Sequence, residues 1–188
     1  IWLKRAAALT GKSEEGLRSR FDILLRALLA RPDLGSITDM SAALRDLVAA
    51  TGDQETPSLR IDRALRALLP RLDGPDGARA GVALARLAIE SLGDLPLAFL
   101  AIERAFAADG DVEDFLILTD LVPTFASDAA LAAKLVVDVR ADVMKQYSSI
   151  GPSLLRLVSL IAEAIGDAAS AAALLVEAAR RAPDEDDL

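Results

Sequence analysis

Cysteine and histidine are both absent from this chain of 188 residues. Without cysteine the chain can form no disulfide and offers no thiolate nucleophile. Without histidine it lacks the most common general base and a frequent ligand of zinc and haem. Carboxylate, lysine, serine and tyrosine chemistry remains open, because those residues are present. The composition gives no sign of a metal centre, and we expect neither a metal nor a cofactor.

Aromatic residues make up only 4% of the chain, although apolar residues as a whole reach 53%. Alanine, leucine and valine must therefore fill the interior. Alanine and leucine favour helix over strand, and small side chains let helices approach one another closely. No stretch has the sustained two-residue alternation, bounded by tight turns, that is typical of a β-hairpin. The sequence predicts an all-α fold.

Positive charge is in deficit, with 21 Lys and Arg residues against 29 Asp and Glu residues and a formal net charge of −8. This balance opposes a general attraction to nucleic acid or to anionic lipid. No uninterrupted apolar run approaches the ~18 residues that a membrane span needs, and no signal peptide opens the chain. We expect a cytoplasmic protein that neither binds nucleic acid nor inserts into a membrane. Because the chain opens at Ile1 rather than at methionine, it is also compatible with a segment of a longer chain or assembly.

Two segments of the chain, residues 84–110 and 157–183, align without a gap at an offset of 73 residues. A third copy begins at Gly52-Asp53, at an offset of 41 from the copy at Gly93-Asp94. The offset of 73 is about two units, so the period lies near 36 to 41 residues. Self-similarity at such a period is the signature of stacked helix pairs. The positions shared by the two longest copies are Leu84 and Leu157, Leu87 and Leu160, Glu90 and Glu163, Gly93 and Gly166, Asp94 and Asp167, Ala98 and Ala171, and Ala105 and Ala178.

Glycine, proline and aspartate divide the rest of the chain into helical stretches. We expect helices over residues 1–10, 14–30, 38–50, 57–70, 77–92, 95–108, 112–123, 128–147, 152–165 and 168–182. Such short connections make neighbouring helices antiparallel. This predicts one domain of five hairpins, with units at 1–35, 36–74, 75–110, 111–149 and 150–183 and an acidic tail or linker at 184–188. At the inner turns, Gly52, Gly93 and Gly166 are expected to be left-handed, and Asp53, Asp94 and Asp167 to cap the next helix.

These residues resemble the tetratricopeptide repeat family, whose pattern has Gly-Asp at the inner turn and small or bulky apolar residues at fixed places on the second helix. Counting from Gly166, the chain supplies Asp167, Ala171, Leu175, Ala178 and Pro183. The copy from Gly93 lacks only the proline, and the unit around residues 112–147 departs from the pattern. The resemblance implies a right-handed α-solenoid that acts as a non-catalytic scaffold or adaptor. A non-repetitive helical bundle is the alternative fold.

In that family a partner protein or peptide lies along the concave surface formed by the first helix of each hairpin. The resemblance places Leu87 and Leu160 there as apolar anchors. The surrounding surface would be acidic, so it would suit a basic, amphipathic or extended segment. The alternative is that these acids only keep an alanine-rich surface soluble. The expected groove residues are Asp39, Asp46, Leu87, Glu90, Arg156, Leu160 and Glu163, with Glu113, Leu116 and Asp120 added by the divergent fourth unit.

Two other functions stay open. The segment Gly11-Lys12-Ser13 resembles the end of a phosphate-binding loop, which would make the chain a nucleotide-binding enzyme. That loop needs a buried strand before it, whereas only a short stretch precedes it here, so we expect Ser13 to cap a helix instead. The chain could also be a regulatory segment that docks within a larger protein. An acidic run at residues 109–114 superficially suggests a calcium loop, but aspartate stands where the loop needs glycine.

Overall fold

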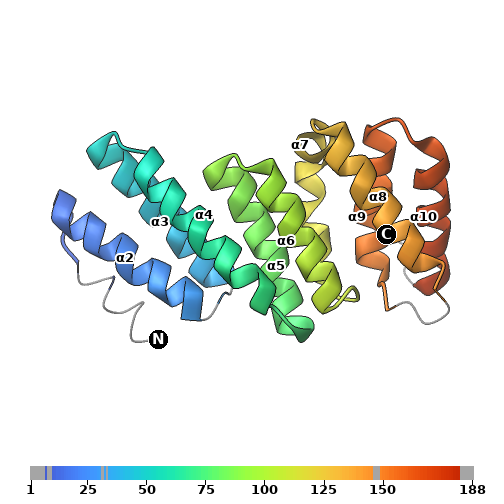
Figure 1. The fold of residues 1–188 in the computed structure, drawn as a ribbon, viewed down its shortest axis with the longest axis horizontal. Helices are drawn as coiled ribbons and strands as arrows, with labels where there is room; N and C mark the ends of the chain where they lie inside the picture. Colours follow the sequence, from blue (N-terminus) through green and yellow to red (C-terminus); the bar gives the residue numbers. More distant parts are fainter. Residues whose placement is uncertain (1–6, 8–9, 31, 33, 146–148, 183–188) are drawn as a thin grey trace.

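The computed structural model describes residues 7, 10–30, 32, 34–145 and 149–182 (Figure 1). All of the regular structure in these residues is helical, and they contain no strand. The all-α prediction is therefore confirmed, while the helix expected at residues 1–10 and the acidic tail lie outside the described residues. The elements are α2 (Glu14–Ala30), α3 (Leu34–Thr51), α4 (Glu55–Leu68), η1 (Leu69–Arg71), α5 (Gly74–Leu87), η2 (Ala88–Leu92), α6 (Leu95–Ala108), η3 (Glu113–Leu121), α7 (Val122–Ala126), α8 (Ala129–Val143), α9 (Pro152–Ala164) and α10 (Ala168–Arg181).

The helices follow one another along the long axis of the molecule and alternate between two rows (Figure 1). In the first row α3 contacts α5, α5 contacts η3, and η3 contacts α9. In the second row α2 contacts α4, the η1 extension of α4 contacts α6, and α8 contacts both α6 and α10. The closest pairs join the two rows, namely α2 with α3, α5 with α6, and α9 with α10. Each element thus packs mainly on neighbours that are near in sequence.

Three inner turns have the geometry expected of their Gly-Asp pairs. Each glycine has a positive φ, which ends the preceding helix at little cost because glycine has no Cβ. Each aspartate then accepts a hydrogen bond from a backbone N–H in the first turn of the next helix. Asp94 and Asp167 are the N-cap residues of α6 and α10, whereas the N-cap position of α4 is held by Gln54, one residue after Asp53. The φ angles are 70° at Gly52, 65° at Gly93 and 83° at Gly166. The bonds run from the nitrogens of Thr56, Leu97 and Ser170 to Oδ1 of Asp53, Asp94 and Asp167 at 3.1, 2.8 and 3.0 Å.

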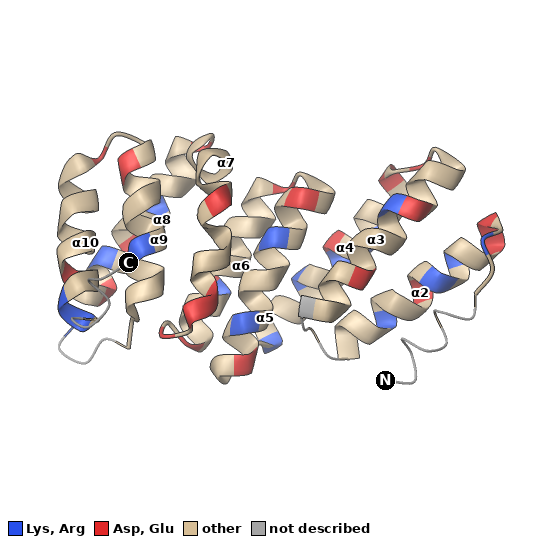
Figure 2. Ribbon diagram, turned by 180° about the vertical axis from the view of Figure 1, so that it is seen from behind, with Lys and Arg blue, Asp and Glu red and all other residues tan. Residues whose placement is uncertain are grey.

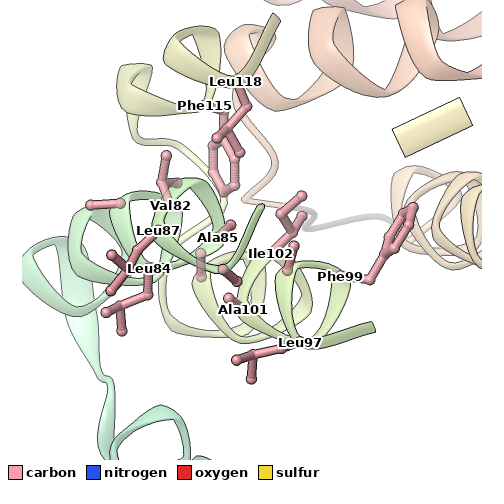
Figure 3. Close-up of a cluster of buried hydrophobic side chains, with 14 of the residues drawn as sticks. Val82, Leu84, Ala85, Leu87, Leu97, Phe99, Ala101, Ile102, Phe115 and Leu118 are labelled. Carbon is pink, nitrogen blue, oxygen red and sulfur yellow. The ribbon is translucent and has the colours of Figure 1, made fainter. Parts of the chain in front are cut away.

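Helices α5 and α6 make a close contact in the middle of the molecule (Figure 3). Ala101 and Ala105 on α6 are buried, and both face Gly81 on α5. A Cβ added to Gly81 would lie 2.8 Å from the Cβ of Ala105 and 3.1 Å from the carbonyl oxygen of Ala101. The two helices therefore touch at backbone distance, and only very small residues fit between them.

The structure corrects the α-helix expected at residues 112–123. Residues Glu113–Leu121 form the 3₁₀ helix η3, and a short α-helix, α7, follows it. The buried residues Val112, Phe115 and Leu118 recur every third residue, which is the repeat of a 3₁₀ helix. An α-helix would turn this stripe away from the core. The segment expected to form a fourth unit thus departs from the predicted pattern in backbone geometry as well as in sequence.

The connection before α9 packs against the turn after α6. The nitrogen of Gly151 donates to the carbonyl oxygen of Gly110 at 2.9 Å. A Cβ added to Gly151 would lie 2.8 Å from the Cα of Asp111 and 3.2 Å from its carbonyl carbon. From the other side, Arg181 of α10 donates to the carbonyl oxygen of Ile150. This connection is held by backbone contacts on one side and by an arginine on the other.

Glu177 ties the end of α10 together. Its carboxylate accepts hydrogen bonds from Arg180 at 2.6 and 2.8 Å and from Arg181 at 2.6 Å. These bonds, first from Arg180 and then from Arg181, lower the pKa of Glu177 from 4.5 to about 2. Because Arg181 also holds the carbonyl oxygen of Ile150, the carboxylate orients the contact between α10 and the connection before α9.

We expect Glu177→Gln to lower the free energy of unfolding at neutral pH by about 1 kcal/mol, because the ion pair of Glu177 and Arg181 is only partly exposed to solvent. The folded-state pKa is depressed, so this stabilisation is complete above pH 4.5 and is lost as the pH falls through about 2. Urea unfolding at several pH values measures the difference. Glu163→Gln, at an exposed glutamate that pairs with no other described residue, serves as the control. A difference between Glu177→Gln and wild type that stayed constant down to pH 2 would contradict this role.

Candidate interaction face

The outer surface of the first row carries most of the residues expected to meet a partner. Acidic and basic residues both recur along the length of the molecule (Figure 2). Seven of the ten expected residues are exposed, and Asp39 and Arg156 are half-buried. The exposed ones are Asp46, Glu90, Glu113, Leu116, Asp120, Leu160 and Glu163. The structure does not, however, bring all of them together.

The anchor role expected of Leu87 is wrong. Its side chain is 1% exposed and lies beside Leu84 in the core (Figure 3), whereas its counterpart Leu160 is 39% exposed. The backbone explains the difference. Helix α9 stays α-helical to Ala164, but α5 passes into the π-helical segment η2 before its glycine. A π turn holds more residues than an α turn, so counting back from the two glycines does not reach the same face.

Asp39 and Asp46 lie on the side of α3 that faces α2. The carboxylate of Asp46 pairs with Arg20 of α2 at 2.8 Å. Asp39 lines a hollow of 380 Å³ together with Lys12 and Arg20. These two acids are therefore separated from the acids of η2, η3 and α9, and the expected continuous acidic groove is not formed at α3.

Arg86 is a charged residue of this face that the repeat pattern did not identify. Its guanidinium pairs with Asp120 of η3 at 2.7 Å and with Glu90 of η2 at 2.8 Å, and it donates to the carbonyl oxygen of Ile117. The pKa of Arg86 is raised, mainly by the hydrogen bonds to Asp120 and then by those to Glu90. Two acids expected to attract a partner thus share one arginine, which compensates half of their negative charge. The i, i+4 spacing of Arg86 and Glu90 in the sequence could have indicated that these two residues pair.

Four exposed residues remain on η3 and α9, two elements that pack side by side. Leu116 and Leu160 are each 39% exposed. Neither Glu113 nor Glu163 pairs with any other described residue through its side chain. We call Glu113, Leu116, Leu160 and Glu163 the η3–α9 strip. It offers apolar contact and negative charge that is not compensated by neighbouring cations of the described chain.

The Gly11-Lys12-Ser13 segment leads into a helix. The hydroxyl oxygen of Ser13 accepts from the nitrogen of Gly16 at 3.2 Å, and its carbonyl oxygen accepts from Leu17 at 2.9 Å. Ser13 therefore caps α2, as expected. Residue 6, which would take the place of the first glycine of a phosphate loop, lies outside the described residues. The adjoining hollow also holds the carboxylate of Asp39 beside Lys12.

A hollow of 640 Å³ lies between the α2–α3 connection and the start of α5. Its wall combines Arg71 and Arg79 with three carboxylates. Arg79 pairs with Asp76 at 3.2 Å and with Asp114 at 3.4 Å, which links α5 to η3. The charged side chains that line this hollow largely pair with one another. The shape of the hollow alone is therefore no evidence for a ligand.

Metal and membrane sites find no support in the described part of the chain. No three acidic side chains there are grouped so as to hold a metal ion. The acidic run after α6 forms a capped turn, in which Asp109 accepts from the nitrogen of Asp111 at 3.0 Å. None of the described helices is both long enough and apolar enough to span a bilayer.

Comparison of the chain with protein-family models, with curated proteins and with solved structures gave no match.

Proposed function

We propose that the chain is a right-handed α-solenoid of the tetratricopeptide type, which binds a partner protein or peptide and catalyses no reaction. The two rows of helices and the three Gly-Asp turns, each with a left-handed glycine, support the solenoid. In such arrays each unit contacts only its neighbours, and the extended surface that results is used for binding. The absence of histidine and cysteine from the chain agrees with a binding role.

The η3–α9 strip is the observation that carries the binding proposal. Exposed leucines flanked by unpaired carboxylates suit a basic amphipathic segment, whose apolar side chains would cover Leu116 and Leu160. The lysines or arginines of such a segment would form ion pairs with Glu113 and Glu163. Charge attraction would set the orientation and the association rate of the partner, and the leucines would provide most of the affinity. The paired acids Glu90 and Asp120 contribute less, because Arg86 already compensates part of their charge.

A designed peptide tests this proposal without knowledge of the natural partner. The probe is a fluorescent leucine–lysine peptide of about 15 residues that becomes an amphipathic helix on binding, and its acidic counterpart replaces lysine by glutamate. Fluorescence anisotropy should show saturable binding of the basic peptide only, weakening as salt rises. Binding of both peptides, or of neither, would contradict a basic amphipathic partner.

Reversing the charges of the strip should weaken binding of the basic peptide. We expect Glu113→Lys with Glu163→Lys to raise its dissociation constant by about tenfold, equivalent to about 1.4 kcal/mol, and to flatten its salt dependence. The control is Glu15→Lys with Glu55→Lys, which changes the net charge equally at exposed glutamates of α2 and α4. Equal loss in both double variants would indicate a general charge effect rather than a site.

We also expect no nucleotide binding at Lys12. A ligand that binds only the folded state raises the melting temperature, with about 2.7 kcal/mol of stabilisation at a hundredfold excess over its dissociation constant. Mg²⁺-ATP at millimolar concentration should therefore leave the thermal unfolding curve unchanged. An increase that Lys12→Ala abolished would instead favour the phosphate-loop function.

A further inference from the structure

The exposed apolar side chains of the molecule gather at the C-terminal end. Among the described residues seven large apolar side chains are exposed, and four of them belong to α8 and α10 or to the residue after α8. Helix α10 forms the end of the array in Figure 1, with α8 beside it in the second row. The four are Val137 at 63% exposure, Met144 at 85%, Leu175 at 56% and Val176 at 70%.

Helix α10 has an outer face that is almost entirely apolar over its first nine residues. From Ala168 to Val176 it carries no charged residue. Its buried face uses Ser170, Leu174 and Ala178, so the opposite face is made of alanine, leucine and valine. A broad apolar face on a helix is normally covered by another surface. The exposed apolar residues of α10 are Ala168, Ala169, Ala172, Ala173, Leu175 and Val176.

A groove of 370 Å³ separates α10 from α8. Val137, Ala141 and Met144 line it on the α8 side, and Ala173 and Leu174 line it on the α10 side, with the charged residues Arg140 and Glu177 on the same two walls. The same molecule therefore presents a groove with a mainly apolar lining and, next to it, a helix face with small apolar side chains. Small side chains allow a second helix to approach closely.

We propose that this surface is the interface of a symmetric dimer, in which α10 of each copy lies antiparallel in the α8–α10 groove of the other. A twofold interface is self-complementary, so one copy must supply both the groove and the helix that fills it, as this chain does. Packing α10 against its symmetry mate places Ala173 of one copy opposite Val176 of the other. Helices α8 and α10 of one copy and the same two helices of the other copy then form a four-helix arrangement.

The charges at the ends of α10 favour the antiparallel direction. Arg180, near the C-terminus, stays exposed although it bonds to Glu177, and its side chain would come alongside Asp167 at the N-terminus of the partner helix. Asp167 carries a lowered pKa, because its carboxylate accepts hydrogen bonds from Ser170, and it is therefore ionised at neutral pH. A parallel pairing would instead bring Arg180 against Arg180. The antiparallel arrangement also opposes the two helix dipoles.

Sedimentation equilibrium tests the dimer directly. Over a series from about 1 µM to about 500 µM, we expect the mass of the wild type to rise from 19.8 kDa towards twice that value. Val176→Glu should raise the dimer dissociation constant by at least about tenfold while its circular dichroism and melting temperature remain those of a folded monomer. The control Leu59→Glu alters an isolated exposed leucine on α4 and should dimerise as the wild type does.

The absence of native cysteine allows the helix direction to be tested by disulfide formation. We expect a mixture of Ala173→Cys and Val176→Cys proteins to form a mixed disulfide dimer faster than either variant alone forms its own. A wild type that stayed at 19.8 kDa at every concentration would overturn the dimer and leave the surface to a partner of different sequence. Faster cross-linking of each variant with itself would overturn the antiparallel arrangement. Since the η3–α9 strip lies on other elements, failure of either test leaves the peptide-binding proposal unaffected.

Discussion

Replacing Ala105 by leucine is expected to lower the free energy of unfolding by about 1–3 kcal/mol. Ala105 is fully buried, and its Cβ faces Gly81 across the closest contact between α5 and α6. Additional methyl groups have no space there unless the two helices move apart. Such a movement would also disturb the neighbouring pairs, because α5 and α6 occupy the middle of the array. Urea or thermal unfolding followed by circular dichroism measures the change.

Ala107→Leu is the matched control for this prediction, because Ala107 lies on the same helix but is exposed. Its stability should remain within about 0.5 kcal/mol of the wild type. If Ala105→Leu were as stable as Ala107→Leu, the close approach of α5 and α6 would be wrong, and with it the packing of the central hairpin.

Replacing Gly151 by valine is the second large effect that we expect, again of about 1–3 kcal/mol. The backbone of Gly151 is in the extended region, with φ −83° and ψ 165°, which valine adopts readily. The loss of stability would therefore come from the clash of the new side chain with the backbone of Asp111 and from strain on the bond to Gly110. Loss of that contact should loosen α9 from the turn after α6.

Gly11→Val is the control, because no atom lies within 4 Å of a Cβ built at Gly11. Thermal unfolding of the two variants should separate them by several degrees for a domain of this size. Equal melting temperatures would show that the connection before α9 is not packed against Asp111.

The sequence predicted the helices most accurately where glycine, proline and aspartate mark both ends. Helices α2 and α6 have the expected bounds, and the three Gly-Asp turns have the expected conformation. Such turns are determined by local preferences, since only glycine adopts a positive φ without strain and aspartate caps the helix that follows. Local residue preferences were therefore sufficient to predict these turns.

Where the backbone departs from the α-helix, the sequence did not predict correctly which residues face the core and which face solvent. The apolar stripe of η3 repeats every third residue, but this repeat was interpreted with the period of an α-helix. The π turn of η2 displaced Leu87 from the surface to the core. The pairing of Arg86 with Asp120 joins residues 34 positions apart, and no local pattern indicates which arginine will compensate which acid. These three features decide which part of the first row remains open to a partner.

Hydrogen exchange of the protein with and without the basic amphipathic peptide tests the location of the binding surface most directly. Binding to the η3–α9 strip should slow exchange of backbone amides in residues Glu113–Leu121 and Pro152–Ala164. At one protein concentration, amides of α8 and α10 should exchange as they do without peptide. Protection confined to α8 and α10, with none in η3 or α9, would contradict the proposed interaction face.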